Sequence, residues 1–304
     1  MVNLDHLSDV TRQIAESTDD EARIERILAD RYIAYTRAND AVAKLEWLLR
    51  SPKKMRMPNL LIVGPTNSGK TMITEKFRRM HPPTMSLDGR ADIVPVLRVQ
   101  MPSAADPLRF YHVVLESLGA PGVAAAKWQR LVQKESQAIQ LLRATGVRVL
   151  IIDEIHNALA GPTNKLSEML NLLRYLGNEL QIPLVAVGVK EALQVIHSDD
   201  QLANRFEPFP LPRWQDDDEL RSLLAAFERA LPLRRPSGLA NPVMTRRLIA
   251  LSEGILGEIV TLIVRAAEMA VRTGNERIDV GLFERIDFMP PSARRASAVA
   301  MRVD

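Results

Sequence analysis

The chain has 304 residues, of which 46% are hydrophobic and 25% charged, so it is large enough for two globular domains or for one large domain with a lid. It contains no cysteine, which excludes disulfides, thiolate metal sites and a cysteine nucleophile, and no apolar run reaches the ~20 residues of a membrane span. The net charge of +3 permits an anionic partner without demanding one, so any case for nucleic-acid binding must rest on local basic clusters.

The first part of the chain predicts an N-terminal arm followed by an α/β domain. The arm, residues 1–30, is amphipathic, and a helix is predicted over Asn39–Leu49. Apolar runs predict strands at Leu60–Val63, Val94–Gln100, Val147–Ile152 and Leu184–Val187. Helical patterns alternate with them at Thr71–Arg79, Leu108–Leu118, Ala124–Thr145 and Lys165–Glu179. This alternation predicts a parallel sheet covered on both faces over residues 31–210, with a ligand beyond the carboxyl ends of the strands.

The pattern changes at Pro208, Pro210 and Pro212, which predict a break in regular structure and a hinge. Beyond the hinge the sequence predicts helices without strands, at Asp216–Ala230, Met244–Ser252 and Ile255–Thr273, and a short closing stretch at Leu282–Asp287. We therefore expect a small helical lid domain over residues 211–289 and a basic, mobile tail over residues 290–304.

A phosphate-binding pattern, G-x-x-x-x-G-K-[ST], follows the first predicted strand and precedes a predicted helix; it reads Gly64-Pro65-Thr66-Asn67-Ser68-Gly69-Lys70-Thr71. Backbone N–H groups of such a loop cradle phosphate oxygens, and the N-terminus of the next helix adds the positive end of its dipole. Lys70 is expected to reach the β- and γ-phosphates of ATP, and the Thr71 hydroxyl to bind Mg²⁺. The alternative is a chance glycine turn that carries a lysine, which leaves both flanking elements unexplained.

Two adjacent acids, Asp153 and Glu154, end the predicted strand at Val147–Ile152. Carboxylates at the tip of a buried strand are costly unless they serve a task. Asp153 is suited to hold Mg²⁺ through water, and Glu154 to polarise the water that attacks the γ-phosphate. A pair of surface acids is the alternative. His156 has no second His or Cys at ligand spacing, so we interpret it as a packing or interface residue.

These two motifs, the proline hinge and the helical lid resemble the AAA+ ATPases. Four blocks are more specifically similar to the TniB family of transposition ATPases, relatives of TnsC and, more distantly, of MuB: residues 56–70, 152–157, 176–180 and 198–208. The similarity runs from about Asp30 to about Val271. It implies an α/β AAA+ P-loop fold, a three-layer parallel sheet domain with a small C-terminal helical lid domain, that uses ATP and Mg²⁺ in the bacterial cytoplasm.

The resemblance also implies partners. A TniB-like protein is expected to oligomerise, as a ring or a helical filament, on double-stranded target DNA without sequence preference. It is expected to recruit or activate a DDE-type transposase and to meet a target-adaptor protein, with no membrane partner.

By the same resemblance, Arg205 lies where AAA+ subunits present an arginine to the ATP of a neighbouring subunit, and a guanidinium there stabilises transition-state charge. An intramolecular salt bridge is the alternative. Val189 and Lys190 occupy the sensor-1 position, where Val189 cannot form a side-chain hydrogen bond, so either Lys190 substitutes or the sensor is silent. The sensor-2 arginine is missing near Glu258. These departures predict slow hydrolysis, as in a switch rather than a motor.

The adenine pocket is expected before the first strand, where Tyr32 and Ile33 offer an aromatic and an apolar surface. Ordinary core packing explains these two residues equally well.

Basic residues between the second strand and the acidic pair are the candidates for DNA contact. A stripe at helical spacing is formed by Lys127, Arg130 and Lys134, with Arg109 at the start of the preceding predicted helix and Arg143 near the end of the later one. Contacts to phosphates would give an affinity that falls with salt and carries little sequence preference. The alternative is a solvated, charged helix face.

Two other functions compete with a transposition regulator. A AAA+ chaperone or protein remodeller usually needs an aromatic pore loop with glycine, and none is evident between the second strand and the acidic pair. A metabolic P-loop kinase does not account for Asp153-Glu154, Arg205 and the helical lid together.

Overall fold

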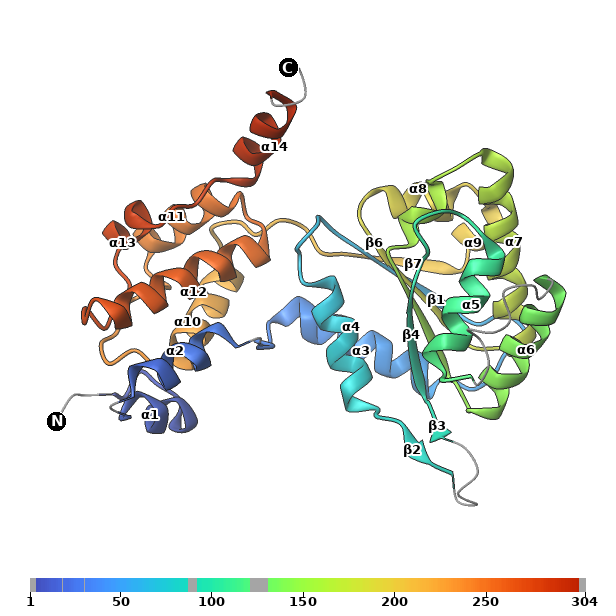
Figure 1. Cartoon of the computed structure of the whole chain (residues 1–304), viewed down its shortest axis with the longest axis horizontal. Coiled ribbons are helices and arrows are strands. Elements are labelled where there is room, and N and C mark those ends of the chain that lie inside the picture. The colour runs from blue at the N-terminus through green and yellow to red at the C-terminus, as the bar shows by residue number, and fades with distance from the viewer. Residues whose placement is uncertain (1–3, 18, 30, 87–91, 121–130, 301–304) are drawn as a thin grey trace. The chain divides into compact units, whose positions relative to one another are not determined.

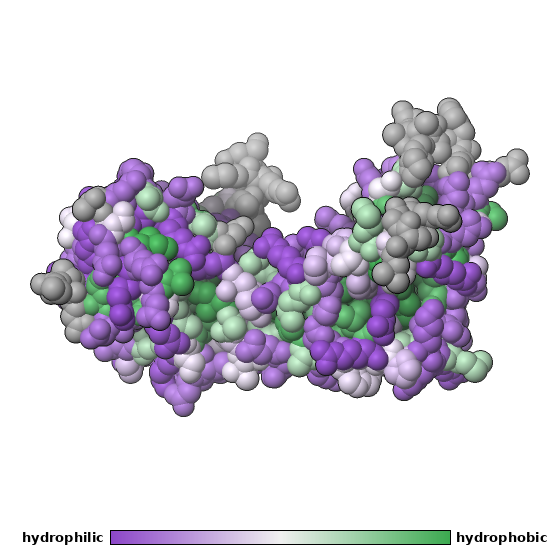
Figure 2. All heavy atoms as spheres, turned by 90° about the horizontal axis from the view of Figure 1, so that it is seen from below, coloured by the Kyte–Doolittle hydropathy of each residue, from purple (hydrophilic) through white to green (hydrophobic). Residues whose placement is uncertain are grey.

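The computed structural model describes residues 4–17, 19–29, 31–86, 92–120 and 131–300, and the chain forms two compact units (Figure 1). Unit 1 comprises Met1–Thr36, Thr66–Gly69 and Pro212–Asp304, and unit 2 comprises Arg37–Pro65 and Lys70–Leu211. Hydrophilic side chains cover most of the face drawn in Figure 2, and hydrophobic residues show there in small areas. Within the described residues, no helix has the length and hydropathy that crossing a bilayer requires.

Unit 2 contains a five-stranded parallel sheet in the order β4-β5-β6-β1-β7. Its strands are β1 (Asn59–Val63), β4 (Val96–Gln100), β5 (Val149–Asp153), β6 (Leu184–Gly188) and β7 (Phe206–Pro210). Every residue of β1, β5 and β6 is buried, because strands covered on both faces have no side that faces water. The short strands β2 (Thr84–Met85) and β3 (Asp92–Ile93) pair as a two-stranded antiparallel ribbon.

Helices cover the sheet of unit 2. They are α3 (Thr36–Arg50), α4 (Lys70–Met80), α5 (Pro107–Ser117), α6 (Leu131–Ala144), α7 (Thr163–Leu180), α8 (Glu191–His197) and α9 (Asp200–Ala203), with the 3₁₀ helix η1 (Ile155–Leu159) after β5. Figure 1 shows α5, α6 and α7 on one side of the sheet and α3 and α4 on the other. Alternate residues of the strands, such as Leu150 and Ile152, share one core with α5, α6 and α7, as the two-residue repeat of a strand requires.

Strand β7 corrects the prediction that the proline cluster breaks regular structure. Pro208 and Pro210 lie within β7, which is an edge strand that, among the described residues, pairs with β1 alone. The Leu211 N–H donates to Val63 O at 2.7 Å, and alternate residues of a strand turn their nitrogens to opposite sides. The proline nitrogens therefore lie on the open side of β7, where a missing N–H costs no ladder hydrogen bond.

Unit 1 is helical. Its helices are α1 (Asp9–Ala15), α2 (Asp20–Leu28), α10 (Asp218–Ala230), α11 (Pro242–Ser252), α12 (Leu256–Arg272), α13 (Val280–Arg285) and α14 (Pro291–Ala300). Ile24 and Ile27 of α2 belong to the same buried core as Ile259 and Leu262 of α12. The segment that the sequence predicts as an arm therefore packs with the lid helices, and the tail that it predicts as mobile contains α14.

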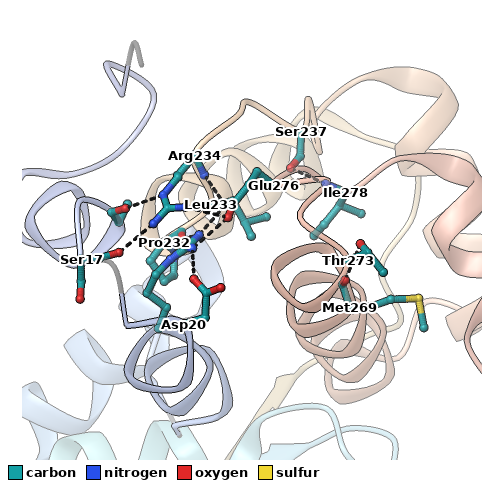
Figure 3. A network of polar contacts seen from close by, with 12 residues as sticks. Ser17, Asp20, Pro232, Leu233, Arg234, Ser237, Met269, Thr273, Glu276 and Ile278 are labelled. Atoms are coloured by element: carbon teal, nitrogen blue, oxygen red, sulfur yellow. Dashed lines mark hydrogen bonds and ion pairs between the residues drawn. The ribbon is translucent and has the colours of Figure 1, made fainter. Parts of the chain in front are cut away.

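A buried ion-pair network fastens α2 to the rest of unit 1 (Figure 3). The Arg23 side chain is fully buried and donates to both carboxylate oxygens of Glu276, and its Nε and Nη2 donate to Pro232 O at 3.2 and 2.8 Å. Arg234 Nη1 also lies 3.3 Å from Glu276 Oε1. Burial of the Glu276 carboxyl raises its pKa, but its hydrogen bonds from Arg23 and Arg234 and their positive charges outweigh burial and lower the pKa overall.

Candidate nucleotide-binding site

The phosphate-binding loop connects β1 to α4, and Lys70 is the first residue of that helix. Gly69 has φ +87°, a conformation that side chains rarely adopt, which explains the second glycine of the motif. Lys70 is only 6% exposed, and its Nζ donates to Gly64 O at 2.9 Å and to Pro65 O at 2.6 Å. Burial lowers the pKa of Lys70, while the charges of Glu154 and Asp153 act in the opposite direction. The ammonium is thus held within the loop, in an environment that favours an added anion.

Thr71 and Asp153 meet at the carboxyl ends of the strands, as expected for a parallel sheet. Thr71 Oγ1 donates to Asp153 Oδ2 at 3.2 Å, and the Glu154 backbone N–H donates to Asp153 Oδ1 at 2.9 Å. Asp153 is 3% exposed. The two predicted Mg²⁺ ligands therefore place their oxygens side by side.

Arg98 is a residue of this site that the sequence did not reveal. It lies on β4, beside β5 in the sheet, and its Nη2 donates to Asp153 Oδ2 at 2.6 Å. Its Nε is buried without a hydrogen-bond partner among the described residues. A single charge inside the apolar strand Val96–Gln100 is the signal that could have indicated it.

Glu154 is held in a strained conformation between β5 and η1. Its φ of 56° and ψ of 38° lie in the left-handed region, which is uncommon for a non-glycine residue and recurs at functional sites. Its Oε2 lies 3.1 Å from His156 Nε2. His156 Nδ1 is buried without a hydrogen-bond partner among the described residues. The interpretation of His156 as a packing or interface residue does not include this contact with Glu154.

The end of β6 carries the sensor-1 position. Gly188 O accepts a hydrogen bond from the Gly64 N–H at 3.2 Å, which ties this strand to the start of the loop. A Cβ on Gly188 would lie 2.8 Å from Ala192 Cβ and 3.2 Å from His156 Nδ1, so a larger residue does not fit without displacement. Val189 is half-buried and Lys190 is exposed. His156 is a further polar side chain that packs against this strand end.

Loop residues Thr66–Gly69 group with unit 1. Asn67 O accepts from the Gly257 N–H at 2.9 Å, and a Cβ on Gly257 would overlap the Asn67 side chain. Glu258 lies near the sensor-2 position, where this chain has no arginine. Its Oε2 lies 2.5 Å from Arg294 Nη2 of α14. Within unit 1 the loop tip therefore packs on the start of α12.

The adenine candidates also belong to unit 1. Ile33 packs against its helical core, and burial raises the pKa of Tyr32. Both residues are half-buried, which leaves part of each surface for a ligand.

Arg205 follows α9 and immediately precedes β7. Its Nη1 donates to Asn178 Oδ1 at 2.8 Å. No carboxylate of the described chain forms an ion pair with Arg205, so the intramolecular salt bridge has no acidic partner there.

The DNA candidates differ in their surroundings. Lys127 and Arg130 lie outside the described residues. Lys134 is 6% exposed with its Nζ 3.4 Å from His112 Nδ1, so it needs a change in its surroundings before it can contact DNA. Arg109 and Arg143 are exposed. Arg109 lies in the first turn of α5 and forms an ion pair with Asp106. Arg143 lies in the last turn of α6 and donates to Glu179 O at 3.0 Å.

A comparison with models of known protein families shows to which family the chain belongs. The family model described as "Bacterial TniB protein" matches residues 23–216, which is more than half of the chain. The chain belongs to the TniB family. This confirms the family resemblance of the sequence blocks, while no curated protein sequence matches this TniB-family chain.

Solved structures resemble this TniB-family chain in fold. The ORC1 protein of Aeropyrum pernix, in complex with DNA, has a TM-score of 0.59 at 19% identity over 90% of this chain and 69% of its own. The ORC2 protein of the same organism has a TM-score of 0.57 at 16% identity over 86% of this chain and 70% of its own. Cdc6p from Pyrobaculum aerophilum has a TM-score of 0.56 at 16% identity over 86% of this chain and 68% of its own. The α/β AAA+ fold is thereby confirmed.

Proposed function

We propose that this TniB-family protein is a slow, DNA-stimulated ATPase of the bacterial cytoplasm that regulates transposition. In this proposal it oligomerises on target duplex DNA when ATP is bound and recruits or activates a DDE-type transposase. The observation that carries the proposal is the TniB match over residues 23–216, which includes the phosphate loop and the acidic strand end. The convergence of Lys70, Thr71 and Asp153 on one strand edge supports the nucleotide chemistry.

Thr71 and Asp153 offer the kind of oxygen ligands that Mg²⁺ prefers. Thr71 Oγ1 and Asp153 Oδ2 are oxygen ligands 3.2 Å apart, and this ion prefers one or two protein oxygens together with phosphate and water. When bound, the ion supplies positive charge to the phosphate oxygens. Asp153 Oδ2 also accepts a hydrogen bond from Arg98 Nη2, so Arg98 would have to give up part of this contact if Asp153 held the ion directly rather than through water.

The protein's own groups supply the remaining chemistry. Lys70 exchanges the carbonyls of Gly64 and Pro65 for phosphate oxygens, which restores the solvation that its ammonium lost on burial. Glu154 accepts a proton from the attacking water, and Arg205 of another subunit stabilises the charge that develops on the γ-phosphate.

The DNA and protein partners rest on the family and on charge. Exposed Arg109 and Arg143, together with Lys127 and Arg130, are the proposed phosphate contacts. A relative in fold, the ORC1 protein of Aeropyrum pernix, was solved in complex with DNA, which supports duplex DNA as the partner. The transposase and a target adaptor follow from the TniB relationship.

The ATPase rate in the presence of different partners tests the proposal. We expect duplex DNA of unrelated sequences to raise the rate of phosphate release, and Lys70→Ala to abolish it with and without DNA. Stimulation by an unfolded protein in place of DNA would instead identify a remodeller. Transfer of the phosphate to a small acceptor would identify a kinase.

A further inference from the structure

A cationic groove lies beside Arg205 in unit 2, with a volume of about 540 Å³. Its lining combines three segments of the chain: Trp47 from α3, Lys54 and Arg56 from the segment before β1, and Gln201, Asn204 and Arg205 around α9. The Asn59 N–H donates to Arg205 O at 2.9 Å, so Arg205 lies beside the first residue of β1. The groove is therefore at the amino ends of β1 and β7.

This position separates the groove from the phosphate loop of the same molecule. The loop leaves the carboxyl end of β1, and a strand of this length advances roughly 15 Å from one end to the other. A nucleotide in the loop of one chain therefore cannot place its phosphates against Lys54, Arg56 and Arg205 of that chain. Nucleotide phosphates in the groove must therefore come from another molecule.

The charges of the groove are uncompensated. Among the residues that the structure describes, its lining includes one lysine and two arginines but no carboxylate. Within the described part of the chain, neither Lys54 nor Arg56 forms a side-chain hydrogen bond or an ion pair, and Arg205 has only the neutral Asn178. A group of cations without acids attracts an anionic partner, whose binding relieves the repulsion between the like charges. Arginine also offers paired donors that match phosphate oxygens.

Trp47 indicates that the partner is a protein surface. Its side chain is 58% exposed, although it is large and mostly apolar. Exposed tryptophans next to arginines are typical anchors of protein interfaces, where they become buried when the partner binds.

We propose that the groove receives the nucleotide-binding face of a second copy of this chain. Lys54 and Arg56 then join Arg205 in contacting the polyphosphate of the ATP that the neighbour holds, while Trp47 packs on the neighbour's protein surface. The inference rests on the proposed function, because it requires a nucleotide at the phosphate loop and an arginine that acts between subunits. Charge complementarity favours this occupant, since bound triphosphate joins Asp153 and Glu154 at the neighbour's site.

Subunit mixing at saturating duplex DNA tests the proposal. Arg205→Ala subunits hold ATP but lack the arginine, and Lys70→Ala subunits provide the groove but no ATP. We expect the mixture to regain ATPase activity that neither variant has alone. Adding Lys54→Gln and Arg56→Gln to the Lys70→Ala subunit should lower the regained rate roughly tenfold, as expected for lost charged hydrogen bonds.

A matched control removes the same charges from a neighbouring depression. Lys53 and Arg148 line that depression of unit 2, and neither contributes to the groove. Lys53→Gln and Arg148→Gln, added to the Lys70→Ala subunit, should leave the regained rate unchanged. An unchanged melting temperature and circular dichroism spectrum of Lys54→Gln/Arg56→Gln in the otherwise unaltered chain would show that the variant is folded.

The outcomes distinguish a failure of the proposed function from a failure of the groove proposal alone. No regained activity in the first mixture would contradict the action of Arg205 between subunits, and with it the proposed function. Regained activity that Lys54→Gln/Arg56→Gln does not lower would overturn the groove while the proposed function stands. A loss of duplex affinity in that variant, with full regained activity, would also overturn the groove in favour of direct DNA contact.

Self-association gives an independent readout for Trp47. In sedimentation experiments with a non-hydrolysable ATP analogue, Trp47→Ala should weaken assembly roughly tenfold, and Trp47→Phe should weaken it less. Equal assembly of Trp47→Ala and the unaltered chain would show that Trp47 is no interface anchor and would overturn its part in the proposal.

Discussion

His156 Nε2 lies 3.1 Å from Glu154 Oε2, so the candidate catalytic base is held by a histidine. The histidine ring in turn packs against Gly188, where a Cβ would come within 3.2 Å of Nδ1. This links the end of β6, where Val189 provides no hydrogen-bonding side chain, to the residue proposed to activate water. We therefore predict that the His156 ring positions the Glu154 carboxylate.

Replacement of His156 by phenylalanine tests this positioning. Phenylalanine fills a similar volume against Gly188 but cannot pair with a carboxylate, so we expect kcat to fall about tenfold with the affinity for an ATP analogue unchanged. His156→Gln, which keeps a donor, should recover part of the loss. If His156→Phe retained full turnover, the contact with Glu154 would have only a packing role.

Glu154→Gln is expected to bind ATP but to hydrolyse it about 10²–10⁴ times more slowly, because an amide cannot accept a proton from water. ATP-dependent complexes with duplex DNA should consequently last longer. Single-turnover phosphate release and DNA dissociation rates measure the two effects. Normal turnover in this variant would remove Glu154 from its proposed role.

Lys70→Ala is expected to abolish nucleotide binding, because the loop loses the cation that faces the β- and γ-phosphates. Equilibrium titration with a fluorescent ATP analogue measures the loss. Lys76→Ala is a suitable control, since Lys76 is an exposed residue of the same helix, α4. Comparable affinities of the two variants would contradict the assignment of the loop.

The salt dependence of DNA binding tests the basic candidates. Replacing Lys127 and Arg130 by glutamine should weaken binding to unrelated duplexes equally, and each lost phosphate contact should flatten the slope of log affinity against log salt by roughly 0.9. Lys134→Gln should have little effect while Lys134 remains buried beside His112. If the Lys127/Arg130 variant kept both the affinity and the slope, the DNA contacts would lie elsewhere.

Arg23→Ala is expected to destabilise the protein by about 3 kcal/mol, because it removes a buried partner of Glu276. The Glu276 pKa lies below its ordinary value of 4.5, so the stabilisation is complete above that pH and is lost as the pH falls below it. Urea unfolding of both chains should therefore show a difference that shrinks in acid. Arg272→Ala, which removes an exposed side chain paired with Glu268 and Glu21, should destabilise the protein much less.

The sequence by itself determined the features that depend on neighbouring residues in the chain. The phosphate loop is contiguous, and the strand before it and the strand that ends in Asp153 are continuous apolar runs whose burial needs no knowledge of partners. The parallel α/β sheet was predicted from these local patterns, and the AAA+ fold and the TniB family from the resemblance of the sequence blocks, which the family match confirms. The four predicted strands differ from the observed ones by only one or two residues at their ends, while β7 and the short strands β2 and β3 were missed.

Only the tertiary structure decided which distant residues meet. Arg98 contacts Asp153 because β4 lies beside β5, and Pro208 and Pro210 are tolerated in β7 because that strand lies at the sheet edge. Arg23 and Glu276 pair across 253 positions of the chain. Strand order and helix docking set these contacts through the burial of many side chains at once, and no local pattern encodes the partner of a single charge.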